Sequence, residues 1–239
     1  SVTVNGTLDM VSGNFDLDAF NLTLGSTAVF SGAPFSASKM IVADGAGYFV
    51  QYFPSGASAA KLFPLGDASG DYSPVELEFT ANSSARSIGA NVTDAVHPND
   101  FGTPDHLTRY WSFTNSTTGS HTANVTFTYV PADVVGNVAN LSLSRFVPSA
   151  STWTELNSTS GLNQLAATGI SDFLVPGSNL PFDISGRNAS GVYYRSQASG
   201  DWDDLTTWEV AANPAGPWSN AIALPTFSNS DSIEIRSMH

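Results

Sequence analysis

Short runs of alternating apolar and polar residues, each closed by Gly, Pro, Asn or Ser, recur along this 239-residue chain. Successive side chains of a β-strand point to opposite faces, so such runs predict strands with one buried face. Clear examples are residues 74–79, 123–129 and 141–146. No segment of useful length has the spacing of an amphipathic helix, and at most one helical turn is expected, at 131–135. The sequence therefore predicts an all-β fold.

Residues 1–48 carry a weak internal repeat. Residues 2–10 align with 22–30, and the same offset aligns Phe15 with Phe35. A period of about 20 residues with small residues at the turns is typical of short β-solenoid-like coils. Two coils are too few to fold alone, because each coil needs a neighbour to cover its open face. An ordinary β-meander is the alternative interpretation of this region.

The rest of the chain divides into two further regions. Residues 49–182 contain longer alternating runs separated by turn clusters, which predict an antiparallel β-sandwich. Residues 183–239 form a connector and a Trp-rich segment that ends in an assembly strand. Aromatic residues are expected to supply much of the sandwich core: Trp111, Phe113, Phe127, Tyr129, Phe146 and Trp153.

The alternation of apolar and polar residues at the C-terminus continues in phase at the N-terminus. Ile233 and Ile235 alternate with polar residues, and Val2 and Val4 resume the same alternation if the end is joined to the beginning. A slip of one residue would place half of these side chains on the wrong face. The parity predicts a head-to-tail assembly in which the C-terminal segment continues into the next unit, either within one polypeptide or between subunits. The residues expected to make this assembly are Val2, Val4, Ile233, Ile235, Trp202, Trp208 and Trp218.

The composition argues against several classes of partner. Charged residues are only 12% of the chain, about half the usual share, and the net charge is -13. Nucleic-acid binding requires a basic stripe that displaces counterions, and the sequence has none. No apolar run approaches the ~20 residues that cross a bilayer, so direct membrane insertion is not expected. Cysteine is absent and hydroxyl-bearing residues are abundant, which favours a secreted protein at the cell surface.

The sequence offers little for catalysis, and no catalytic residue is expected. No Gly-x-Ser-x-Gly elbow follows a strand, and no pair of histidines has the spacing of a zinc site. Calcium is the best ligand hypothesis, because Asp67, Ser69 and Asp71 have alternate spacing in a loop. Plain turn chemistry is the interpretation that we prefer for the same residues. No cofactor besides calcium is expected.

Two features suggest contacts at the surface. Trp202, Trp208 and Trp218 either plug the contact between modules, which we prefer, or stack against sugar rings. Asn-X-Ser/Thr sequons, which permit glycosylation in a secreted protein, stand at Asn5, Asn21, Asn82, Asn91, Asn115, Asn124, Asn140, Asn157 and Asn188.

Two segments have distinctive motifs. The residues that define them are Gly200, Trp202, Thr207, Trp208, Trp218, Pro225, Asp231 and Ile233 to Ile235 in the Trp-rich segment, and Lys61 to Gly66 with Tyr72 to Val75 in the second segment. These motifs resemble those of repetitive secreted and cell-surface adhesins of Bacteroidetes. The Trp-rich segment is similar to one that opens a short stack of β-solenoid coils in that family, and the other is similar to a motif of the sandwich that follows the coils. Here the Trp-rich segment follows the coils, which is the order expected of a repeating array cut at another point.

The resemblance implies no enzymatic activity. We therefore expect a structural or adhesive repeat of a giant surface adhesin, or a subunit of an extracellular filament, that assembles head-to-tail through its terminal β-strands. The expected partners are copies of the same chain, with surface glycans as a further candidate. The alternative is a carbohydrate- or calcium-dependent binding module of a secreted protein.

Overall fold

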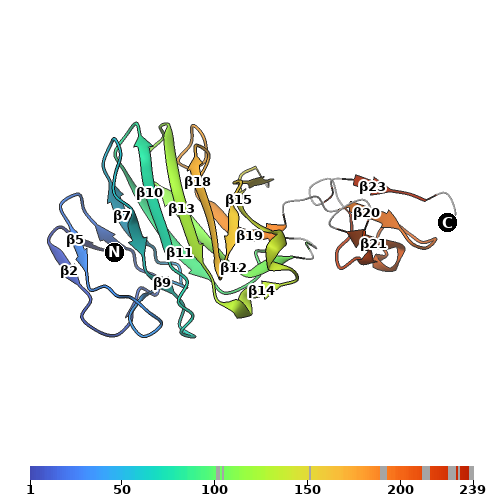
Figure 1. The fold of residues 1–239 in the computed structure, drawn as a ribbon, viewed down its shortest axis with the longest axis horizontal. Coiled ribbons are helices and arrows are strands. Elements are labelled where there is room, and N and C mark those ends of the chain that lie inside the picture. The colour runs from blue at the N-terminus through green and yellow to red at the C-terminus, as the bar shows by residue number, and fades with distance from the viewer. Residues whose placement is uncertain are drawn as a thin grey trace.

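The computed structural model describes residues 1–100, 103, 105–150, 152–188, 193–211, 216–225, 230 and 232–236. Strands make up 48% of the structure and helices 4%, and the strands form several sheets, none of which is closed. The predicted all-β class is confirmed. Figure 1 shows the sheets following one another along the long axis, with β2 (Thr7–Asp9) and β23 (Ser232–Glu234) at opposite ends.

Three parallel ladders stack the N-terminal strands. The first contains β1 (Val2–Val4), β4 (Leu22–Leu24) and β7 (Phe49–Phe53); the second contains β2 and β5 (Val29–Ser31); the third contains β3 (Phe15–Asp16), β6 (Ile41–Val42) and β9 (Leu65–Gly66). Val2 pairs with Leu22, as the sequence repeat predicts. Phe15 pairs with Ile41 and not with Phe35, because the connecting segment contains a short antiparallel bridge of its own.

The first ladder continues into an antiparallel sheet that faces a second sheet. Beyond β7, the larger sheet contains β11 (Arg86–Thr93), β12 (His106–Asn115), β19 (Phe182–Asn188), β15 (Leu141–Val147) and β16 (Thr152–Glu155), and β14 (Val134–Val135) pairs with β12. The facing sheet contains, in order, β17 (Thr159–Gly161), β18 (Gln164–Ile170), β13 (His121–Thr128), β10 (Val75–Asn82) and β8 (Lys61–Phe63). The arrangement is sandwich-like, and consistent with the β-sandwich predicted for this part of the chain.

The main core lies between these two sheets. Trp111 and Phe113 on β12 are fully buried, and their ring centroids lie 5.0 and 5.8 Å from the ring of Phe127 on β13. Tyr129 belongs to the same cluster, which extends into the N-terminal ladders through residues such as Phe49. The tilted and edge-on ring contacts are the geometry that aromatic pairs prefer. The four aromatic residues Trp111, Phe113, Phe127 and Tyr129 therefore fill the core as predicted.

Phe146 and Trp153 pack outside this main core. Their ring centroids are 5.2 Å apart, and both lie 4.8 Å from the imidazole of His97. On β15 the residues that join the main core are Leu141 and Leu143. Phe146 has the opposite parity and so points to the other face of the larger sheet.

The C-terminal strands form a separate four-stranded sheet, which we call the C-terminal lobe. Its order is β22 (Ser219–Asn220), β21 (Trp208–Ala211), β20 (Tyr193–Ser196) and β23. β20 is antiparallel to β21 but parallel to β23. The lobe has its own small core of Tyr194, Trp208, Val210 and Ala221, against which Ile233 packs.

Helical structure is confined to short turns in the described part of the chain. These 3₁₀ turns are η1 (Pro131–Asp133), η2 (Val138–Asn140) and η3 (Leu205–Thr207). The first lies where the sequence predicts a single helical turn. A membrane-spanning helix of sufficient length and apolarity is not found among the described residues.

Candidate functional site

The N-terminal ladders end on exposed apolar residues. In the first ladder Val2 is 58% exposed, whereas its neighbours Leu22 and Phe49 are 2% and 0% exposed. In the third ladder Phe15 is 43% exposed and its partner Ile41 is fully buried. Within the described residues, β1 and β3 each have one neighbouring strand. The same ladder position is therefore buried inside the stack and uncovered at its end, where the backbone is also open to pairing.

A groove of about 240 Å³ crosses this open end, and we call it the N-terminal groove. Phe20, which is 63% exposed, lies along it with Val2 and Phe15. Asp16 carries the only side-chain charge among its lining residues, and its Oδ1 accepts a hydrogen bond from the backbone of Asp18. The lining residues are Ser1, Val2, Phe15, Asp16, Leu17, Phe20, Asn21 and Leu22. The groove is thus apolar with an acidic margin.

The C-terminal lobe has a similar open edge at β23. Ile233 on this strand packs inward, whereas Ile235, just beyond it, is 71% exposed. The backbone N–H of Arg236 donates to Ser196 Oγ at 2.9 Å, and its Nη1 lies 3.6 Å from Glu209 Oε1. β23 runs parallel to its neighbour β20, just as β1 runs parallel to its neighbour β4.

Trp202 and Trp208 are in contact but differ in environment. Their ring centroids are 4.8 Å apart, and the indole N–H of Trp208 donates to the carbonyl of Trp202 at 3.0 Å. Trp208 is 2% exposed and belongs to the lobe core, whereas Trp202 is 50% exposed. Both line a pocket of about 240 Å³ together with Ile235 and Thr207. The buried hydroxyl of Thr207 has no hydrogen-bond partner among the described residues.

Trp218 is not part of this pocket. Its ring packs against the guanidinium of Arg195, which lies 3.8 Å from the ring centroid, and Arg195 also binds Glu209. Of the residues expected to assemble units, the structure therefore brings together Trp202, Trp208 and Ile235. Val2 lies at the other open end, described above.

A buried arginine binds four carboxylates at the side of the sandwich. Arg109 on β12 is fully buried; its Nη1 lies 2.7 Å from Asp67, its Nε 2.8 Å from Asp133, and its Nη2 3.3 Å from Asp71 and 3.2 Å from Asp94. Burial alone would lower the pKa of Arg109, but hydrogen bonds to Asp133 and Asp67 raise it above its ordinary value. The cluster ties the loop after β9, the end of β11, β12 and η1 to one another.

The predicted calcium ligands lie in this cluster. Asp67 Oδ1 accepts hydrogen bonds from the backbone of Ser69 and Asp71, and Oδ2 binds Arg109. Burial raises the pKa of Asp67, but bonds from Ser69 and Arg109 hold it below its ordinary value. Oxygens of Asp67, Asp71 and Asp94 lie within 4.8 Å of one another. The guanidinium already supplies positive charge between them, and turn chemistry accounts for Ser69, so calcium binding stays a prediction.

The buried side chain of His97 lies near Asp183 and Ser112, but the three do not form a catalytic triad. Its Nε2 lies 3.2 Å from Asp183 Oδ2, and its Nδ1 accepts a hydrogen bond from the backbone of Asn99. Ser112 Oγ donates to the other oxygen of Asp183. In a serine hydrolase the histidine stands between serine and aspartate and takes the serine proton. Here the aspartate stands in the middle, so this trio anchors the loop after β11 to the sheet.

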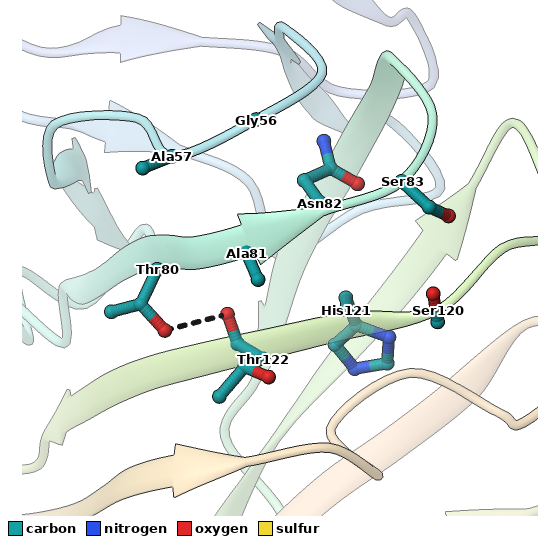
Figure 2. Close-up of a pocket in the computed structure, with 9 residues that line it drawn as sticks. All are labelled: Gly56, Ala57, Thr80, Ala81, Asn82, Ser83, Ser120, His121 and Thr122. Carbon is teal, nitrogen blue, oxygen red and sulfur yellow. Dashed lines mark hydrogen bonds between the residues drawn. The ribbon is translucent and has the colours of Figure 1, made fainter.

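A pocket of about 420 Å³ opens beside a bulge in β10, and Figure 2 shows the residues that line it. Thr80 Oγ1 donates to the carbonyl of Thr122 across the two strands. His121 is the only titratable side chain in this lining, and its Nε2 accepts a hydrogen bond from the backbone of Leu174. Burial, followed by the charge of Arg86, lowers the pKa of His121 to about 4. A nitrogen so occupied is poorly placed to act as a general base.

The sequon asparagines differ in exposure. Asn82 is 4% exposed and its amide nitrogen donates to the carbonyl of Pro54, and Asn91 is 6% exposed and donates to Gly45. A glycan is attached at this same nitrogen, so it would displace these bonds. Glycosylation stays a prediction at every sequon. The asparagines are exposed at 5, 140 and 157, half-buried at 21 and 124, and buried at 82, 91, 115 and 188.

Sequence reasoning missed Arg109 and its partners Asp94 and Asp133. Burial of Arg109 could have been predicted from the alternation of apolar and polar residues, because Arg109 has the same parity as Leu107 and Trp111, which point into the core. A buried guanidinium requires carboxylate partners. Which carboxylates these are depends on how distant segments pack, and no local pattern reports that.

Comparison with known proteins does not assign the chain to a family. No family model matches it, and neither a curated protein nor a solved structure is significantly similar to it. The functional argument therefore rests on the edges, pockets and clusters described above.

Proposed function

We propose that this protein is a structural unit of an extracellular assembly whose copies join head-to-tail through unpaired β-strand edges. The observation that carries the proposal is the end of the parallel ladders, where Val2 and Phe15 are exposed although Leu22 and Ile41 beside them are buried. We take residues 1–48 to be a short stack of β-solenoid-like coils with one open end. Such a stack requires a further layer to cover it.

The uncovered apolar surface gives a driving force for association. With ~200 Å² for a phenylalanine and ~25 cal/mol per Å², covering the exposed 63% of Phe20 is worth about 3 kcal/mol. The same estimate gives about 2 kcal/mol for Phe15, which is 43% exposed. Proteins usually protect an edge strand with charge or proline, and β1 has neither. These contributions offset part of the entropy that association costs.

The second edge lies on the C-terminal lobe. If β23 of one copy adds to β1 of another, each strand extends a mixed sheet at an edge whose last pair is parallel, and strand addition is a known route to assembly. The two surfaces are different, so the contact is heterologous and does not need to close into a ring. Repetition of such a contact generates a filament, whether the units are covalently linked or separate.

The composition supports a location outside the cell. The chain has no cysteine, only 12% charged residues and many hydroxyl-bearing residues. Its motifs resemble those of secreted adhesins, which supports the same location. The role we propose is therefore adhesive or structural and requires no catalysis.

The backbone of Thr3 offers a direct test of the β1 edge. The N–H of Val2 bonds to Asn21 and the carbonyl of Val4 accepts from Gly25, both on the β4 side. Because backbone groups alternate sides along a strand, those of Thr3 point to the open side. Thr3→Pro removes the outward N–H without removing a bond to β4.

We expect Thr3→Pro to weaken self-association at least tenfold, with Thr3→Ala as the matched control. The measurements are sedimentation velocity over a range of protein concentrations and electron microscopy for filaments. A wild-type chain that stays monomeric up to millimolar concentration would remove the proposal. Equal association of the two variants would show that β1 is not the contact.

A second candidate function is carbohydrate binding at the Trp202 pocket. Trp202 is 50% exposed, and the Thr207 hydroxyl in the same lining lacks a partner among the described residues. A sugar ring could stack on the exposed indole of Trp202, and it would bond to the buried Thr207 hydroxyl only after a local rearrangement. The test is a glycan array with Trp202→Ala and, as control, Ile222→Ala, which alters another exposed apolar residue of the same lobe outside the pocket. Binding lost only in the tryptophan variant supports this function, and an array without signal dismisses it.

A further inference from the structure

We infer that the N-terminal groove of one copy receives Ile235 and Arg236 of a second copy. The inference rests on the proposed head-to-tail function and names the side chains that form its contact. Ile235 would cover the apolar floor of the groove, and Arg236 would bind Asp16 at its margin. Each copy carries both halves of this contact, at opposite ends of the molecule (Figure 1).

The apolar half of the contact follows from position. Ile235 is 71% exposed directly after the edge strand β23. Val2, on the edge strand β1, lines the N-terminal groove with Phe15 and Phe20, which are also exposed. If β23 pairs with β1 in the register that sets Ile235 opposite Val2, Ile235 comes beside the groove. In that register the strand contact and the side-chain contact form together.

The charged half follows from the scarcity of basic residues. The chain has eight lysines and arginines and a net charge of -13, so two copies repel each other unless a local pair of opposite charges compensates. Arg236 keeps 37% of its side chain exposed, next to Ile235. Its partner within the lobe, Glu209, is also bound by Arg195. Asp16 supplies the single side-chain charge of the groove lining, and its sign is opposite to that of Arg236.

Charge reversal tests the pair. We expect Asp16→Arg and Arg236→Glu each to weaken self-association at least tenfold in sedimentation velocity, and the double variant to recover to within threefold of wild type. Glu155→Arg, an equal charge change on the exposed edge strand β16, is the control and should leave association unchanged. Melting temperatures of all variants establish that each is folded.

Cysteine trapping tests the apolar contact, because the natural chain has no cysteine. A Phe20→Cys protein mixed with an Ile235→Cys protein should give a crosslinked dimer under a mild oxidant, visible on a non-reducing gel. Phe20→Cys mixed with Ile222→Cys is the matched control, since residues 222 and 235 are equally exposed in the same lobe. Equal crosslinking in the two mixtures would overturn the assignment of Ile235.

The outcomes separate this inference from the function on which it rests. Failure of the double variant to recover would overturn the Asp16–Arg236 pair. If Thr3→Pro abolishes association but neither charge reversal weakens it, the strand contact stands and the groove contact falls. If the wild-type chain does not associate at all, both fall.

Discussion

Replacement of Arg109 by methionine should destabilise the sandwich more than any other single loss of charge among the described residues. The side chain is 0% exposed and binds Asp67 and Asp133, which are each 4% exposed, at 2.7 and 2.8 Å. Methionine has similar length but no charge, so these two carboxylates would stay buried without a cation. Breaking a buried pair from one side costs about 3–5 kcal/mol, and we expect a loss in this range.

The assay is urea unfolding at pH 7, followed by far-ultraviolet circular dichroism. With an m value of about 2 kcal/mol/M, the expected loss shifts the midpoint by about 2 M. Adding Asp67→Asn and Asp133→Asn to Arg109→Met removes the stranded charges and should restore more than half of the loss. Lys39→Met removes a half-buried cation that lies over the ring of Phe35, and should alter stability by no more than about 1 kcal/mol.

A loss below about 1 kcal/mol for Arg109→Met would refute this reasoning, because the carboxylates would then have found water or another partner. A triple variant less stable than the single one would refute it as well. In that case the aspartates would contribute through their bonds to the backbone, and not through the guanidinium.

Three further predictions concern pH, packing and metal binding. His121 has a pKa of about 4 in the folded chain and about 6.5 in the unfolded chain, so the unfolded chain binds more protons between these two pH values. The free energy of unfolding should therefore fall, by at most about 3 kcal/mol, as the pH is lowered from 6.5 to 4. In His121→Gln the pH dependence of urea unfolding should be smaller. A methyl group on Gly200 would lie 2.2 Å from Thr207 Oγ1, so Gly200→Ala should lower the stability of the C-terminal lobe by about 1–3 kcal/mol in thermal melts, whereas Gly6→Ala, with open space around it, should not. Arg109→Met leaves its carboxylates without a cation, so calcium should raise the melting temperature of this variant more than that of wild type, and an equal shift in both would contradict the view that the guanidinium occupies the site.

The elements of the fold could be predicted from the alternation, whereas the pairing of those elements could not. Runs such as 123–129 and 141–146 are strands because parity and turn residues are local properties of the sequence. Phe146 shows the limit of this reasoning. Its run identifies a strand, but which face of that strand meets the main core depends on the other sheet, and Phe146 lies on the far face beside His97.

Some residues of the candidate sites could likewise be predicted from local patterns, whereas their partners could not. Of the exposed apolar residues at the ladder end, Val2 could be singled out from the sequence because apolar parity continues up to the edge, whereas Phe15 and Phe20 could not. Arg109 could have been recognised as buried, but its carboxylate partners come from segments as far apart as Asp67 and Asp133. The sequence could identify Asp67 as a loop residue with oxygen donors. It could not reveal that a guanidinium lies between those donors, because long-range packing places it there.

The small separate core of the C-terminal lobe has a consequence for how the molecule unfolds. Among the described residues its core cluster consists of Tyr194, Trp208, Val210 and Ala221, with Ala211 also buried, against the much larger cluster of the sandwich. A core of that size provides little stability by itself, so heating should give two transitions, the first in the lobe. A bound partner stabilises only the folded form, by an amount that grows with its concentration. If the lobe is a docking element, the lower transition should rise with protein concentration while the upper one stays fixed.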